Sequence, residues 1–129
     1  MVSNNYSQPT LYQFNKAAMA SFPVLQDLSS AEKLINDYTL KFEEDVYMLL
    51  CKDISYYTIF KQEDLKATEF STLGDAVLTC IKEDLGEILF VELTEDKSGI
   101  EIWFKNKDQE AFCMYLFNAK PLIVEYGGF

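Results

Sequence analysis

Apolar side chains recur at helical spacing near the start of the sequence. Residues 10–21 predict a short helix that has Thr10 as its N-cap residue and ends before Pro23. A second helix is expected to begin at Ser29 or Ser30, because the apolar positions that follow fall on one helical face: Leu34, Ile35 and Tyr38.

The third helical pattern is the most regular one and covers residues 72–85. Ser71 or Thr72 is the expected N-cap residue, and Gly86 stands at the position where glycine commonly ends a helix. An apolar stripe runs along one face: Leu73, Ala76, Val77, Cys80, Ile81 and Leu85.

The other apolar segments have the pattern of strands. Residues 46–51 are apolar at every position, which favours a strand covered on both faces. Residues 54–60 are rich in aromatic and β-branched side chains, so the two segments predict a β-hairpin joined tightly at Lys52-Asp53. Further strands are expected at 88–93, 100–105, 111–117 and 122–126. In 100–105 the side chains of Ile100, Ile102 and Phe104 point inward.

Together these elements predict an α+β fold of order α-α-β-β-α-β-β-β-β, an antiparallel β-meander sheet with helices packed on one face. We expect a flexible N-terminal arm (1–9), a single domain (10–126) and a mobile tail (127–129). The order β-β-α-β-β-β after a leading helix resembles that of the roadblock and longin type of dimerising domains. This resemblance of topology implies a homodimer.

The charge balance is strongly acidic. Asp and Glu total 21 against 11 basic residues, all of them lysine, which gives a net charge of −10. Such a chain is repelled by nucleic-acid backbone and by anionic lipid, so we expect a basic protein partner, no direct nucleic acid and no membrane. The sequence shows neither a secretory signal nor an apolar run of about 20 residues, so we expect a cytoplasmic protein.

Several kinds of chemistry are excluded by residue type. The chain has no histidine, which removes catalytic triads and histidine metal sites, and no arginine, which removes bidentate clamps on phosphate. Its few glycines form no phosphate-binding loop, and three widely spaced cysteines fit no zinc pattern. We therefore expect no enzyme activity, no catalytic residue, no metal and no cofactor.

The remaining candidates are carboxylates and aromatic side chains. Paired carboxylates serve glycosidases and metal sites, but these acids lie at element ends, where solvated acids are ordinary. We assign them instead to partner binding: Glu43, Glu44, Asp45, Glu63, Asp64, Glu83, Asp84 and Glu87. Trp103 is interpreted either as an aromatic covered by a neighbouring element or as an anchor for a partner, and Tyr47, Tyr56 and Tyr57 pose the same choice.

Two functional hypotheses follow. The first is an acidic inhibitor encoded by a phage or mobile element, or a toxin immunity protein, that occupies a basic, nucleic-acid-binding surface of its partner. The lysine-only, Asn-, Ile- and Tyr-rich composition is typical of AT-rich coding, which favours such an origin. The alternative is a non-catalytic oligomeric scaffold or regulatory module, favoured by the many aromatic residues and by the two-faced apolar strand.

Overall fold

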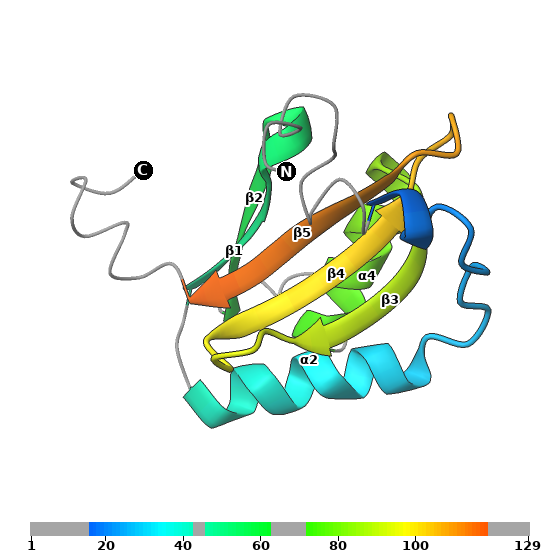
Figure 1. Ribbon diagram of the computed structural model, residues 1–129. Coiled ribbons are helices and arrows are strands. Elements are labelled where there is room, and N and C mark those ends of the chain that lie inside the picture. Colours follow the sequence, from blue (N-terminus) through cyan, green and yellow to red (C-terminus); the bar gives the residue numbers. More distant parts are fainter. Residues whose placement is uncertain (1–15, 43–45, 63–71, 119–129) are drawn as a thin grey trace, which may run out of the picture.

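The computed structural model describes residues 16–42, 46–62 and 72–118. Within them the chain is an α+β fold, in which helices α2 (Ser29–Phe42) and α4 (Leu73–Asp84) pack on one face of a five-stranded antiparallel sheet (Figure 1). This confirms the predicted fold class and the order of the described elements. The arm (1–9), the last predicted strand (122–126) and the tail (127–129) lie outside the described residues.

The sheet consists of a hairpin and a meander side by side. The hairpin is β1 (Val46–Cys51) with β2 (Tyr56–Lys61), and the meander is β3 (Glu87–Leu93), β4 (Gly99–Lys105) and β5 (Ala111–Asn118). Their order in space is β2-β1-β5-β4-β3, so β5 returns to the middle of the sheet and pairs with β1. On the helix side of β1, Leu49 and Cys51 belong to the core, whereas on the other face Met48 is buried and Leu50 is partly exposed. The predicted cover on both faces is therefore incomplete at Leu50.

The connection within the hairpin is longer than predicted. Residues Lys52–Ile54 form one turn of 3₁₀ helix, η2, and Ser55 then adopts a left-handed backbone with φ 52°. The two-residue turn predicted at Lys52-Asp53 is therefore wrong, and β2 begins at Tyr56. Tight two-residue hairpin turns need positive φ angles and favour glycine or asparagine, which this pair lacks.

The two long helices begin differently from each other. The predicted cap of α4 is confirmed, since the Thr72 side chain accepts a hydrogen bond from the Asp75 N–H. The serine cap predicted for α2 is wrong, because Ser29 is already helical. Instead, Asp27 Oδ1 accepts hydrogen bonds from the Ser29 N–H at 2.9 Å and from the Ser29 hydroxyl at 2.6 Å. Asp and Asn favour this local bonding before a helix.

The helices cross at Gly74. A Cβ atom there would lie 2.7 Å from the Glu32 carbonyl oxygen, so only glycine permits this approach. Asn36 Oδ1 accepts a hydrogen bond of 2.8 Å from the Gly74 N–H, and the Thr72 hydroxyl donates one of 3.2 Å to Glu32. These polar contacts fix α4 against α2 above the sheet.

Two tyrosines connect α2 to the sheet. Tyr38 and Tyr47 meet edge to face with ring centroids 6.0 Å apart, and both rings are buried. The Tyr47 hydroxyl donates to the Thr39 carbonyl at 3.0 Å, and the Tyr38 hydroxyl donates to the Ser98 carbonyl at 2.9 Å. Tyr47 therefore belongs to the core, which the helices and sheet enclose together with Ile35, Leu49, Val77, Ile102 and Met114.

The opposite face of the sheet has a cover of its own at one end. The chain is helical at residues 16–19, which overlaps the predicted helix 10–21, and Met19, Ala20 and Val24 pack on this face. Figure 1 shows this segment in blue on the side of the sheet away from α4. No helix within the described ranges is both long enough and apolar enough to cross a membrane.

Candidate interaction surface

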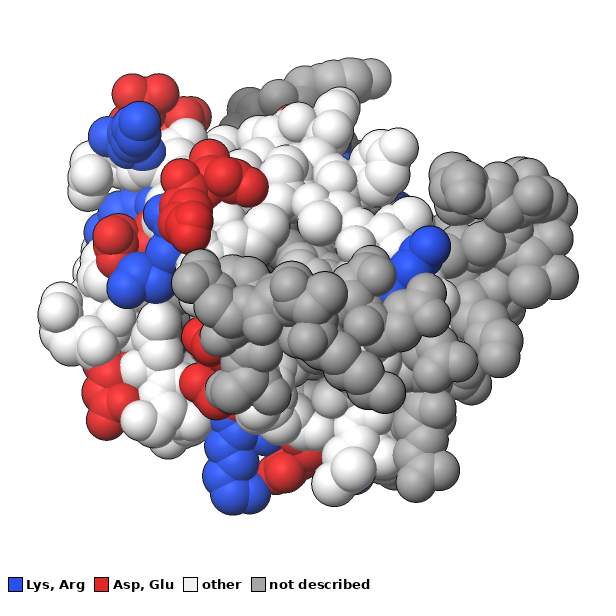
Figure 2. All heavy atoms as spheres, turned by 180° about the vertical axis from the view of Figure 1, so that it is seen from behind, with Lys and Arg blue, Asp and Glu red and all other residues white. Residues whose placement is uncertain are grey.

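Three of the eight predicted acidic residues lie within the described part of the chain, where α4 ends and β3 begins. The other five lie outside the described residues: Glu43, Glu44, Asp45, Glu63 and Asp64. Glu83 and Asp84 end α4 and Glu87 begins β3, and all three side chains are exposed. Lys105 lies opposite Glu87 in the sheet. On the face shown in Figure 2, the described acidic groups lie near basic ones among uncharged side chains. Partner binding by these acids stays a prediction.

Trp103 lies under a cover. Its side chain is 5% exposed and packs with Met19, Leu89 and Cys113 on the face of the sheet away from the helices. Its Nε1–H donates a hydrogen bond of 3.3 Å to Glu101 Oε1. The expected opposition to Ile102, which faces the helices, is confirmed. The structure thus gives Trp103 the place of a covered aromatic, and its contact with a partner stays a prediction.

A row of cross-strand neighbours runs over the whole width of the sheet on the face away from the helices. Each member pairs with the next in register, and we call this set the transverse row: Glu92, Glu101, Tyr115, Leu50 and Tyr57. Residues directly opposite each other share a face and lie about 5 Å apart. Tyr57 is 58% exposed and Tyr115 is 38% exposed, while Leu50 and Glu101 are partly exposed. The row is thus open to solvent along its length.

A β-bulge determines which side chain of β3 joins this row. Ile88 pairs with Phe104 on the helix side, but Phe90 pairs with Trp103, so the register shifts between Ile88 and Phe90. Strict alternation from Ile88 would turn Glu92 toward the helices. The extra residue instead places Glu92 opposite Glu101 on the open face.

A groove of about 530 Å³ lies beside the centre of the row. Its described wall is formed by β5, by the end of β1 with η2, and by the turn between β3 and β4. The apolar part is lined by Leu50, Tyr115 and Phe117, and the polar part by Lys52, Asp53, Thr94 and Ser98. Partly apolar concave sites with a few polar groups are typical of ligand pockets.

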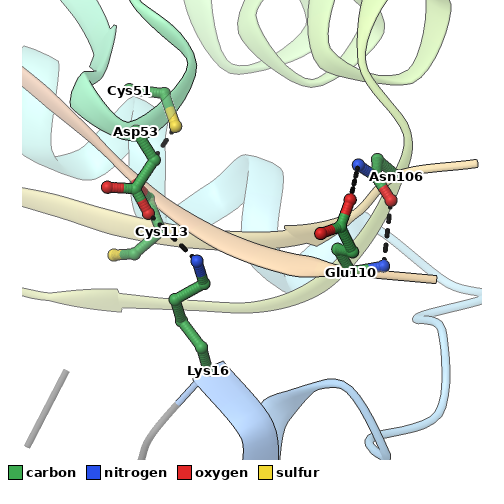
Figure 3. A network of polar contacts seen from close by, with 6 residues as sticks. All are labelled: Lys16, Cys51, Asp53, Asn106, Glu110 and Cys113. Atoms are coloured by element: carbon green, nitrogen blue, oxygen red, sulfur yellow. Dashed lines mark hydrogen bonds and ion pairs between the residues drawn. The ribbon is translucent and has the colours of Figure 1, made fainter. Parts of the chain in front are cut away.

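Asp53, one of the residues that line the groove, forms an ion pair. Lys16 Nζ lies 3.4 Å from Asp53 Oδ2 and 4.4 Å from the centre of the Phe112 ring. Figure 3 shows Lys16 reaching from the covering segment toward Asp53 on η2. Nearby, the Cys51 thiol donates to the Cys113 carbonyl at 3.5 Å and connects β1 to β5. Beyond them, Asn106 and Glu110 hold the β4–β5 turn.

Two of the titratable groups that line the groove, Cys113 and Tyr115, are neutral acids at physiological pH. Burial raises the pKa of the Cys113 thiol, and the charge of Glu101 acts in the same direction. Burial raises the pKa of Tyr115 to about 12, again with a contribution from Cys113 and Glu101. A thiol that stays protonated is a poor nucleophile. The arrangement therefore suits binding better than covalent chemistry.

The transverse row was not predicted from the sequence. Tyr57 was named as a possible interface residue, and the structure exposes it while burying Tyr47 and half-burying Tyr56. Glu92, Glu101 and Tyr115 were not among the residues predicted to bind a partner. Alternation within β4 places Glu101 on the same face as Trp103, and this was the only available signal.

Comparison of the chain with protein-family models, with curated proteins and with solved structures found no significant match. The resemblance of element order to roadblock and longin domains is accordingly one of topology alone. Within the described part of the chain, no group of three or more Cys, Asp or Glu side chains is placed to hold a metal ion.

Proposed function

We propose that this chain is a small acidic protein-binding domain without enzyme activity, which occupies a basic, nucleic-acid-binding surface of a partner. The observation that supports the proposal is the transverse row, where two carboxylates stand beside exposed aromatic and aliphatic side chains at the edge of a groove. Aromatic anchors bordered by charge are typical of protein interfaces.

The charge of the whole chain supports the same function. A net charge of −10 attracts a basic partner over a distance and speeds the encounter, while the row supplies the short-range contacts. In this proposal the protein acts in the cytoplasm, as an inhibitor from a phage or mobile element or as an immunity protein. The absence of any disulfide among Cys51, Cys80 and Cys113 suits a reducing compartment.

The proposal is tested with the immobilised chain and a lysate of its source cells. We expect a basic protein to be retained at about 0.1 M salt and released at about 1 M, where the Debye length falls to about 3 Å. Heparin, a polyanion, should displace the same protein, because it competes for the nucleic-acid-binding surface. If the retained partner were released neither by salt nor by heparin, the proposal would be refuted.

A homo-oligomeric scaffold is the second candidate. It is supported by the apolar half of the transverse row, where Tyr115, Leu50 and Tyr57 meet solvent. Light scattering after gel filtration tests it directly. A dimer that persists at micromolar concentration would favour the scaffold, and a monomer at high concentration would count against it.

A further inference from the structure

The two halves of the transverse row differ in chemistry. Glu92 and Glu101 occupy the end on β3 and β4, whereas Tyr115, Leu50 and Tyr57 occupy the end on β5, β1 and β2. Resting on the proposed function, we propose that the row binds one segment of a basic partner that presents a lysine or arginine and, about 10 Å further on, a large apolar side chain.

The spacing comes from the sheet itself. Neighbouring strands lie about 4.8 Å apart, so the midpoint of the Glu92–Glu101 pair is about two strand spacings from the midpoint of Tyr115 and Leu50. A segment lying across the strands meets the acids first and the groove second. A helix spans this distance in about seven residues and an extended chain in about three.

Two like charges make up the acidic half of the row. Glu92 and Glu101 lie directly opposite each other, and like charges at such positions repel. Neither forms an ion pair within the described part of the chain, where the ion pairs are Lys16–Asp53 and Lys33–Asp37. Glu101 is held in place, since Trp103 Nε1 donates to its Oε1 at 3.3 Å and the Cys113 thiol at 3.5 Å. A cation bound between the two carboxylates would relieve their repulsion without rearranging Glu101.

The apolar half offers a place for an anchor. Tyr115 and Leu50 line the groove together with Phe117, and Tyr57 extends the apolar strip to the edge of the sheet. Tyrosine contributes large contact area at small entropic cost and is enriched at interface centres. A leucine or aromatic side chain of the partner fits this part of the row.

A second copy of the chain is a poorer occupant. In a symmetric pair centred on Tyr115, the row of one protomer would run opposite to that of its partner. Each Glu92 would then face a tyrosine and each Glu101 a leucine, because the row contains no lysine. Such a pairing leaves the carboxylates without a cation.

The test uses three synthetic peptides in ¹⁵N-HSQC titrations of the full chain. The first carries two lysines, two alanines and two leucines in that order. The second replaces the leucines by alanine, and the third replaces the lysines by glutamine. We expect the first peptide to shift the amides of the transverse row and to bind at least tenfold more tightly than either of the others.

Charge variants then locate the site. Glu92→Lys should weaken the first peptide at least tenfold, while Asp108→Lys, with the same change in net charge on the far β4–β5 turn, should change its affinity less than twofold. Dispersed HSQC spectra establish that both variants fold. The inference would be overturned if both variants weakened the first peptide equally or if all three peptides bound equally well. It would also be overturned if the peptide shifted only amides of other surfaces, or if the chain associated with itself through the row. If the Glu92→Lys variant still retained a heparin-sensitive basic partner, the row would not be the binding site, but the proposed function would stand.

Discussion

The opposition of Glu92 and Glu101 has a measurable consequence for stability. Exchanging Glu92 for lysine converts a repulsive cross-strand pair into an attractive one, so Glu92→Lys should stabilise the protein in the absence of a partner. Glu92→Gln removes the repulsion alone and should give a smaller gain. A substitution such as Glu92→Lys, which stabilises the fold but weakens binding, is expected where an unfavourable interaction is retained because binding requires it.

The size of the effect follows from the register. Directly opposite side chains lie about 5 Å apart, where two unit charges interact by about 0.8 kcal/mol in water. Removing the repulsion should therefore add about 0.5 kcal/mol, and adding the attraction about 1 kcal/mol in total, because Glu92 is exposed and screening reduces both values.

Urea denaturation followed by the fluorescence of Trp103, the single tryptophan, measures the change. If the free energy of unfolding falls by about 2 kcal/mol per molar urea, a gain of about 1 kcal/mol raises the urea midpoint by about 0.5 M, provided that m is unchanged. The gain should fall by more than half at about 1 M salt. Asp108→Lys controls for net charge and should stay within about 0.5 kcal/mol of the wild type. A destabilised Glu92→Lys, or a gain that Asp108→Lys reproduces, would contradict the cross-strand explanation.

Three further predictions test other parts of the structure. Gly86→Ala should lower the free energy of unfolding by about 2 kcal/mol or more in urea titration, because a Cβ atom there would collide with the Lys105 carbonyl oxygen. The control Glu87→Ala, at the next residue, should leave the free energy of unfolding nearly unchanged. Met19→Ser should shift the Trp103 emission to longer wavelength by uncovering the indole, with CD unchanged; an unshifted spectrum would refute the cover. The pKa of Tyr56 is raised to about 12, chiefly by burial and by the Cys80 thiol, so its neutral phenol stabilises the fold fully below pH 10 and loses this effect as the pH rises through 12. In the Tyr56→Phe variant, the free energy of unfolding should therefore fall less steeply between pH 10 and 12 than in the wild type. If the free energies of the two proteins fell in parallel over this range, the assignment would be wrong.

Local sequence signals predicted the elements well because each acts over a few residues. The 72–85 pattern gave α4 and its Thr72 cap, since spacing, cap and stripe agree there. Gly86 follows α4 as predicted but for another reason: its φ is not left-handed, and the Lys105 backbone excludes a Cβ. That contact joins residues far apart in sequence, so no local pattern reveals it. The two-residue turn predicted at Lys52-Asp53 was wrong because the pair lacks the glycine or asparagine that such a turn favours, and η2 takes its place.

The site was less predictable because it depends on neighbours across the sheet. Alternation tells which residues of one strand share a face, but it does not tell which strands lie side by side. Leu50 and Tyr115 become neighbours only because β5 returns beside β1, and the element order alone leaves that pairing open. Local acidity predicts partner binding by Glu83, Asp84 and Glu87, but it does not reveal that Glu92 and Glu101 lie opposite each other.

The bulge in β3 connects the local irregularity to the proposed function. Without it, Glu92 would face the helices opposite buried Ile100, where an unpaired carboxylate costs several kcal/mol. With it, Glu92 meets Glu101 on the open face at a cost of under about 1 kcal/mol, and Glu101 pairs with Tyr115, which lines the groove. Bulges often re-aim a side chain next to a functional site. The bulge therefore serves the fold by keeping Glu92 out of the core, and it leaves the carboxylate pair on the face where we propose that a basic partner binds.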